Sequence, residues 1–529
     1  MHVTPKKTFT TISPATTQLN VSLPGILTPE KPHPMKTVLQ QSVPDIRIQT
    51  MNEANVHRSG SFVLYWTTAS RRLNCNFALD RALEHCRSLD RPLLIFEPLR
   101  CDYRWASRRL HSFVIQGMRD NAETAARFGH AYVPWVQRDV GGGSGLLQDL
   151  AAKACVIVTD DYPCFFLPQM VRATARHLPV RLEAVDSNGL LPMRATDQIF
   201  PTAYAFRRFL QKNLTPHLTT QPHPNPLSDP KIPRLTELPA LFGHRPGLCS
   251  SSELENPASW MDSIPIDQEV RETGSVGGSN TARQCLTQFL SHRLARYGEE
   301  RNEPDADAAS GLSPWLHFGH ISVHEIFSRL TEREKWSITQ LGDPRQTRGS
   351  RSGWWGMSDS TESFLDELVT WRELGFNMCW QDRRYDRWDS LPQWARKTLK
   401  EHAADPRPEI YSHEQLESAA TRDHIWNAAQ RQLLREGRMQ NYLRMLWGKK
   451  VLEWSPQPQQ ALASLIELNN KYALDGRDPN SYSGIFWVFG RYDRAWGPER
   501  RIFGKIRYMT SDSTARKLDL KRYLQTYGR

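Results

Sequence analysis

The segment from residue 437 to residue 454 reads Gly437-Arg-Met-Gln-Asn-Tyr-Leu-Arg-Met-Leu-Trp447-Gly-Lys-Lys-Val-Leu-Glu-Trp454. Trp447 and Trp454 are seven residues apart, which is two turns of an α-helix, so their side chains lie on one face. Asn441 and Met445 lie within about one turn of that face. Such a helix suits packing against a large flat redox cofactor, although aromatic stripes at helical spacing more often belong to an ordinary core.

Two further segments carry polar groups in compact patterns. Asp475-Gly-Arg477-Asp478 offers two carboxylates and one guanidinium in a tight turn. Taken alone, this turn is a surface ion pair that contributes under about 1 kcal/mol. Ser310-Gly-Leu-Ser313 precedes a proline and predicts a helix start with a serine cap. The free N–H groups of that helix start can bind a phosphate, or the serine can be a plain cap.

Length, charge, cysteine spacing and apolar runs limit the class of protein to which the chain can belong. At 529 residues the chain is long enough for two or more domains. Lysine and arginine number 68 against 57 aspartates and glutamates, an excess that favours polyanion partners such as nucleic acid or forms a solvated basic surface. The eight cysteines show no metal-binding spacing, so we predict free thiols and no metal site. No apolar run is long enough to predict a transmembrane helix.

The first half of the chain predicts an α/β domain. Residues 1–56 are rich in Thr, Pro and Ser, and we predict a disordered tail there. Residues 57–214 alternate helical stretches with five short apolar runs, which predicts a doubly wound, five-stranded parallel sheet. We interpret the Gly141-Gly-Gly-Ser-Gly145 cluster as a flexible loop, because it matches no phosphate-binding motif. The apolar runs are 61–66, 92–96, 131–136, 155–159 and 180–185.

The second half predicts a connector and a helical domain. Residues 215–280 are rich in Pro, Ser and Gly, which is typical of an interdomain linker. Residues 281–529 show helical periodicity without strands, so we predict an all-α domain. Within it, residues 333–357 form a loop rich in Gly, Arg and Trp. The expected helices are 281–297, 322–331, 360–381, 423–435, 440–454 and 458–472.

Five motifs in one order give the chain its family resemblance. They are residues 437–454, Asp475-Gly-Arg-Asp-Pro-Asn480, Ser310–Ser322, Trp426-Asn-Ala-Ala-Gln and Phe503-Gly-Lys-Ile-Arg-Tyr-Met. Together they resemble the flavin-binding core of class II cyclobutane pyrimidine dimer DNA photolyases, over roughly residue 55 to the C-terminus. The resemblance implies an FAD-binding all-α domain that is active with reduced FAD. It also allows an antenna chromophore in the α/β domain, whose identity no residue gives.

The resemblance assigns site residues by position. It places the cofactor between the serine-rich helix start and the Asp475 turn, with Arg444 paired to an aspartate. Asn469 and Asn480 are both candidates for the amide that faces flavin N5. The cofactor-binding residues that it implies are Tyr297, Ser310, Leu312, Ser313, Asn441, Arg444, Asp475 and Asp478.

The same resemblance assigns the electron route and the lesion pocket. Trp447, Trp426 and Trp454 match the tryptophans that reduce the flavin in this family. Tryptophan suits this role, since indole is the most readily oxidised aromatic side chain. Glu367 would hydrogen-bond the dimer, although a lone glutamate on a helix is more often a solvated residue. The residues that would line the pocket or contact DNA are Trp487, Met445, Asp493 and Arg494.

The resemblance implies a light-driven DNA repair enzyme, a deoxyribodipyrimidine photo-lyase. The expected partner is double-stranded DNA containing pyrimidine dimers, and we expect a monomer with no membrane association. The expected location is the cytoplasm in a bacterium, and the nucleus or an organelle in a eukaryote. One alternative is a cryptochrome-like blue-light photoreceptor on the same fold, which would not need a lesion pocket. A second is a flavin-free relative, which would not need Arg444 and Asp475.

Overall fold

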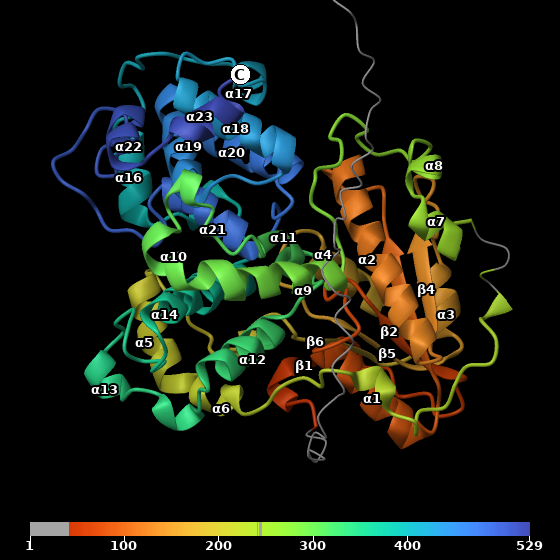
Figure 1. Ribbon diagram of the computed structural model, residues 1–529. Helices are drawn as coiled ribbons and strands as arrows, with labels where there is room; N and C mark the ends of the chain where they lie inside the picture. Colours follow the sequence, from red (N-terminus) through yellow and green to blue (C-terminus); the bar gives the residue numbers. More distant parts are fainter. Residues whose placement is uncertain (1–41, 241, 243–245) are drawn as a thin grey trace, which may run out of the picture. The chain divides into compact units, whose positions relative to one another are not determined.

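The computed structural model describes residues 42–240, 242 and 246–529, and predictions for residues 1–41 lie outside that range. The N-terminal part is built on a six-stranded sheet in the order β1-β6-β5-β2-β3-β4 (Figure 1). The neighbouring strands among β2 to β6 are parallel, which confirms the predicted parallel sheet. Their bounds are β2 (Phe62–Trp66), β3 (Leu93–Leu99), β4 (Ala131–Val136), β5 (Ala154–Asp160) and β6 (Leu182–Val185).

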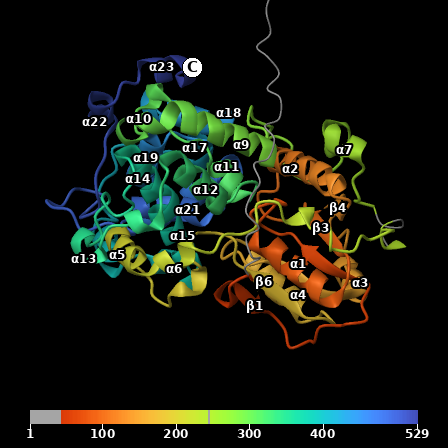
Figure 2. The ribbon, with the colours of Figure 1, turned by 60° about the horizontal axis from the view of Figure 1, so that its bottom comes forward.

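Helices cover both faces of this sheet (Figure 2). One core cluster joins α1 (Phe77–Leu89) to alternate residues of β2, and another joins α3 (Leu146–Ala151) and α4 (Leu167–Ala175) to the remaining residues of β2. Successive strand residues point to opposite faces, so a strand covered on both sides needs apolar side chains throughout. All five residues of β2 are buried, and the doubly wound arrangement that we predicted is confirmed.

The sheet also has an edge strand that the sequence did not reveal. β1 (Ile48–Thr50) pairs antiparallel with β6 and follows the short 3-10 helix η1 (Asp45–Arg47). Both elements lie within residues 1–56, for which we predicted a disordered tail. Three residues are too few to show the alternation that identifies a strand in sequence, so only the pairing with β6 reveals it.

Residues 215–280 link the two parts of the chain and pack against the sheet domain. Apart from α6 (Thr215–Leu218), α7 (Ser251–Glu255) and α8 (Ala258–Met261), most of this segment is irregular. Met261 is fully buried in a cluster with side chains of α2 (Arg108–Arg127). The connector therefore contributes to the core of the sheet domain.

The C-terminal part is helical, as predicted. Two of the expected helices are interrupted by π-helical turns, and one of these, η8 (Asp366–Trp371), carries Glu367. Single π-helical turns within α-helices occur frequently at functional sites. The helices used below are α5 (Ala203–Asn213), α10 (Leu294–Glu300), α11 (Ser313–His317), α13 (Pro344–Thr347), α14 (Asp359–Leu365), α15 (Arg372–Gln381), α18 (His424–Glu436), α19 (Asn441–Trp454), α20 (Pro458–Tyr472), α21 (Pro479–Val488) and α23 (Lys521–Tyr527).

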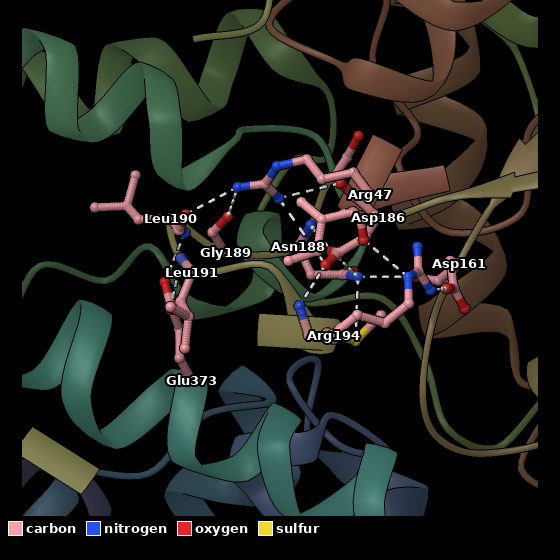
Figure 3. Close-up of polar contacts among 12 residues, drawn as sticks. Arg47, Asp161, Asp186, Asn188, Gly189, Leu190, Leu191, Arg194 and Glu373 are labelled. Carbon is pink, nitrogen blue, oxygen red and sulfur yellow. Dashed lines mark hydrogen bonds and ion pairs between the residues drawn. The ribbon is translucent and has the colours of Figure 1, made fainter. Parts of the chain in front are cut away.

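A buried polar network joins the sheet domain to the helical domain (Figure 3). The Arg47 guanidinium donates hydrogen bonds to three backbone carbonyls of residues 186–190, at 2.8–3.2 Å. From α15, the Glu373 carboxylate accepts hydrogen bonds from the backbone N–H groups of Leu190 and Leu191, at 2.7 and 3.0 Å. The segment after β6 is therefore held by charged groups from both domains.

Candidate flavin and lesion site

The helices α19 and α21 carry seven of the eighteen predicted site residues and pack closely. Gly448 permits this approach, since a Cβ there would lie 2.4 Å from a methyl group of Val488. Asn480, Gly484 and Trp487 share one face of α21 by their spacing. A Cβ on Gly484 would meet no atom within 4 Å, so this face borders open space.

Arg444 and Asp475 form a partly exposed ion pair. Arg444 Nη2 lies 3.3 Å from Asp475 Oδ1, and the two side chains are 25% and 15% exposed. Asn441 and Met445, on the same helix as Arg444, are also at least partly exposed. The pair therefore fixes a guanidinium at a surface that a ligand can reach.

Asp478 has a different environment from Asp475. Its carboxylate caps α21 by accepting from Asn480 N at 2.8 Å, and it also accepts from the Tyr162 hydroxyl at 3.0 Å. His317 Nδ1 lies 3.4 Å from the same carboxylate. Asp478 is buried, and these contacts give it a structural role in joining α21 to the sheet domain.

The two candidate asparagines also differ in burial. Asn469 is 3% exposed, and its amide nitrogen donates to Ser481 Oγ at 2.6 Å. Asn480 is exposed, and its side chain makes no hydrogen bond to a described residue. The geometry places Asn480 on the open face of α21 and Asn469 behind it.

The predicted serine cap of α11 is not formed. This helix begins at Ser313 with Leu312 at the capping position, and no side chain bonds its first N–H groups. Ser310 instead accepts a weak bond from Leu312 N at 3.4 Å, while Ser313 is exposed. Tyr297, on α10, is buried against Phe364.

The three tryptophans form a continuous buried array. The rings of Trp447 and Trp426 are stacked, with centroids 6.4 Å apart and an angle of 9° between their planes. Trp454 meets Trp426 edge to face at 5.5 Å. The Trp426 indole N–H donates to the Trp447 carbonyl at 3.0 Å. Trp426 therefore lies between Trp447 and Trp454 in the array.

Glu367 lies in the π turn η8 and is 32% exposed. It pairs with Arg301, which lies just after α10. Burial of its surroundings raises the pKa of Glu367 above its usual range, although the charges of Arg301 and Arg351 oppose that rise. The carboxyl is therefore reachable but incompletely solvated.

Trp487 and its neighbours lie at the far end of the open face. The Lys449 ammonium is fully buried, donates to the Val488 carbonyl at 2.6 Å and lies 4.7 Å from the Trp487 ring centroid. Burial lowers the pKa of Lys449 to about 7. Asp493 pairs with Arg507 at 3.1 Å, while Arg494 is exposed above the Trp496 ring.

Sequence reasoning missed Arg301 and Lys449. In the sequence, each is one of many lysines and arginines in helical segments, and no spacing separates them from solvated ones. Gly484 offered a weak signal, because a glycine inside a helix costs about 1 kcal/mol and suggests a packing or binding reason.

A second site lies in the sheet domain, where a cavity of about 440 Å³ opens at the carboxyl ends of the parallel strands. Residues 141–148 form part of its wall, together with Trp66 and Trp135. The glycine cluster that we interpreted as a flexible loop thus lines this cavity. A Cβ on Gly143 would lie 2.3 Å from the Trp135 ring, so the loop packs directly on that ring. His317 and Arg477 extend the wall into the helical domain.

Two further predictions can be compared with the described residues. Those residues contain no cluster of His, Cys, Asp and Glu suited to a metal ion. They also contain no helix that is long and apolar enough to cross a membrane. All eight cysteines are free, and seven of them are buried.

Solved structures with the same fold define the class of protein. The chain aligns with a bacterial class III photolyase from Agrobacterium tumefaciens at a TM-score of 0.64, covering 88% of this chain and 86% of that one. It aligns with the cryptochrome of Synechocystis sp. PCC6803 at a TM-score of 0.58, covering 88% of each chain. The sequences are 17% identical in both alignments, so the likeness shows the fold, which is that of photolyases and cryptochromes.

Sequence relatives narrow this class, although no family model matches the chain. The chain is 32% identical over 482 residues to a deoxyribodipyrimidine photo-lyase from Methanothermobacter thermautotrophicus, covering 90% of this chain and 97% of that protein. It is 33% identical to the enzyme of that name from Oryza sativa subsp. japonica, covering 88% and 87%. The chain therefore belongs to the deoxyribodipyrimidine photo-lyase family.

Proposed function

We propose that this chain is a class II member of its family and repairs cyclobutane pyrimidine dimers in DNA by light-driven electron transfer. The arrangement of α19 carries the proposal. Its buried tryptophan array runs out from the helix that also carries the partly exposed side chains of Arg444 and Met445. One helix thus joins an electron route to a ligand site.

The residues at this site fit FAD. The open face beside Gly484 can accept a flat ring system, and the Arg444–Asp475 pair supplies charge at its edge. An asparagine amide offers both donor and acceptor, so Asn469 or Asn480 can bond a ring nitrogen in either protonation state. Tyr297, Asn441 and the α11 start, including Ser310, Leu312 and Ser313, would hold the rest of the cofactor. When bound and reduced, FAD supplies the transferred electron after excitation by light.

A dimer flipped out of the duplex would contact the open face from the other side. Trp487 offers a ring for base stacking, and Met445 offers an adaptable apolar contact. The Glu367 carboxyl, protonated more readily than usual, can donate a hydrogen bond where negative charge develops on the dimer. Arg494 and Asp493 belong to the loop that would contact the DNA around the lesion.

The tryptophan array would reduce the flavin and take no part in dimer splitting. Trp447→Phe should therefore block light-driven flavin reduction in the presence of an external reductant. The same variant, reduced chemically before illumination, should still split dimers. An inactive pre-reduced variant would place Trp447 in the lesion pocket.

The cavity at the strand ends suits a second, light-gathering chromophore. It has aromatic walls and a few polar groups, among them Arg71, Arg100 and Asp102. Its wall shares Arg477 with the turn that carries Asp475, so energy transfer to the flavin site would cover a short path. Absorption bands beyond those of flavin in the purified protein would support this assignment.

One experiment separates repair from the photoreceptor alternative. The purified protein, with its flavin reduced, is illuminated with dimer-containing duplex DNA, and the remaining dimers are counted against a dark control. Light-dependent loss of dimers is expected from a monomeric protein bound to DNA. No loss, with FAD fully bound, would favour the photoreceptor. Absence of FAD would favour a flavin-free relative.

A further inference from the structure

The arginine loop, residues 343–358, lies outside the site described above. It contains three arginines and one carboxylate, Asp343, which pairs with Arg345 at 2.9 Å. Arg345, Arg348 and Arg351 are all exposed. Arg351 makes no ion pair or side-chain hydrogen bond with any described residue. Arg348 and Arg351 therefore present positive charge without an ion-pair partner among the described residues.

The loop backbone is held at two points. The Gln211 side chain of α5 accepts a hydrogen bond from Gly349 N at 2.6 Å. The Glu362 carboxylate of α14 accepts from Gly356 N at 2.8 Å. Arg351 lies between these two anchors, so its backbone is positioned before any partner binds.

Further contacts of α5 position the loop relative to Glu367. The Arg207 guanidinium of α5 donates to both oxygens of Asp366, at 2.7 and 2.9 Å, and to the Gly349 carbonyl at 3.3 Å. Asp366 precedes Glu367 in η8. The charge of Arg351 also acts on the Glu367 carboxyl. Figure 1 shows α13, which is part of the loop, beside α5.

We propose that Arg351, supported by Arg348, binds the phosphate backbone of DNA beside the flipped dimer. A guanidinium binds phosphate through two parallel hydrogen bonds and stays charged at any physiological pH. The inference rests on the proposed function, because the loop is braced against the turn that would present Glu367 to the dimer. It adds a contact surface from a segment that carries none of the predicted site residues.

The test measures binding in the dark. Full-length, FAD-loaded Arg351→Gln and wild type are titrated with matched duplexes, with and without a cyclobutane dimer, at several salt concentrations. Each lost phosphate contact lowers the slope of log Kd against log salt by about 0.9, so the variant should show a slope lower by about one and a Kd several-fold higher on both duplexes. Arg351→Lys should keep the slope.

Arg127→Gln is the matched control, since Arg127 is an exposed arginine in the last turn of α2. It should leave both Kd values and both slopes unchanged. Unchanged binding by Arg351→Gln would overturn the proposal, and so would weaker binding of the dimer duplex alone with an unchanged slope. Loss of FAD from the variant would assign Arg351 to the cofactor and also overturn it. Failure of wild type to split dimers would instead count against the proposed function.

Discussion

Two glutamates six residues apart, Glu367 and Glu373, have nearly opposite surroundings. Glu367 lies in the π turn, is 32% exposed and pairs with a side chain, Arg301. Glu373 lies on α15, is 4% exposed and accepts from two backbone N–H groups. Burial raises the pKa of both carboxyls, that of Glu373 to about 7.

The two glutamates differ in the groups that their carboxylates contact. The partners of Glu373 are backbone N–H groups of the sheet domain, which have no other described acceptor (Figure 3). The partner of Glu367 is an arginine side chain that is 23% exposed, so a ligand can reach it. A raised pKa alone therefore does not identify a functional carboxyl, because structural ion networks shift pKa values too.

The largest effect is expected from Glu373→Ala. Each buried N–H left without an acceptor costs about 1–3 kcal/mol, so the free energy of unfolding should fall by about 2–6 kcal/mol. Urea unfolding of the FAD-loaded protein would measure it, with Glu367→Ala as the matched variant. Equal losses of unfolding free energy in the two variants would show that the two glutamates do not differ in their structural role.

The second expectation concerns pH. The pKa of Glu373 is about 7 in the folded protein, above the usual glutamate value, so between these two values the folded state binds the proton more tightly. The contribution of this group to stability is fully present below about pH 4.5 and falls as pH rises to about 7, by at most about 1.4 kcal/mol per pH unit. Glu373→Gln should remove this slope. A wild-type slope retained in the variant would assign it to another group.

Trp487→Ala tests the proposed lesion pocket, to which Glu367 also belongs. Loss of base stacking should remove about 1–3 kcal/mol of affinity for dimer-containing duplex. Binding of undamaged duplex should change little, because the ring would contact only flipped bases. Trp260→Ala in the connector serves as the matched tryptophan control. Similar weakening on both duplexes would remove Trp487 from the lesion pocket.

The smallest effect is expected from Glu367 itself. Glu367→Ala should weaken dimer binding by about 1 kcal/mol, typical of one neutral hydrogen bond. The quantum yield of splitting should fall modestly in Glu367→Gln and further in Glu367→Ala, with FAD content unchanged. The yield is measured per absorbed photon on pre-reduced protein with saturating dimer. A wild-type yield in Glu367→Ala would leave Glu367 without a role in repair.

Some features of the fold were readable because they depend on local pattern. The buried strand β2 shows as an uninterrupted apolar run, since both faces of a covered strand need apolar side chains. The spacing of Trp447 and Trp454 placed both on one helix face, since helical periodicity is local. Their link through Trp426 came from family resemblance, because Trp426 lies on another helix.

Other features were decided only by tertiary structure. β1 is three residues long and becomes a strand only by pairing with β6. Asp475 and Asp478 lie in one turn with similar sequence surroundings, yet Asp475 meets Arg444 at an exposed edge while Asp478 is buried against Tyr162. Glu367 and Glu373 likewise cannot be told apart by periodicity. The partners of these groups lie 31 to 316 residues away along the chain, so the sequence names these groups and the packing assigns their roles.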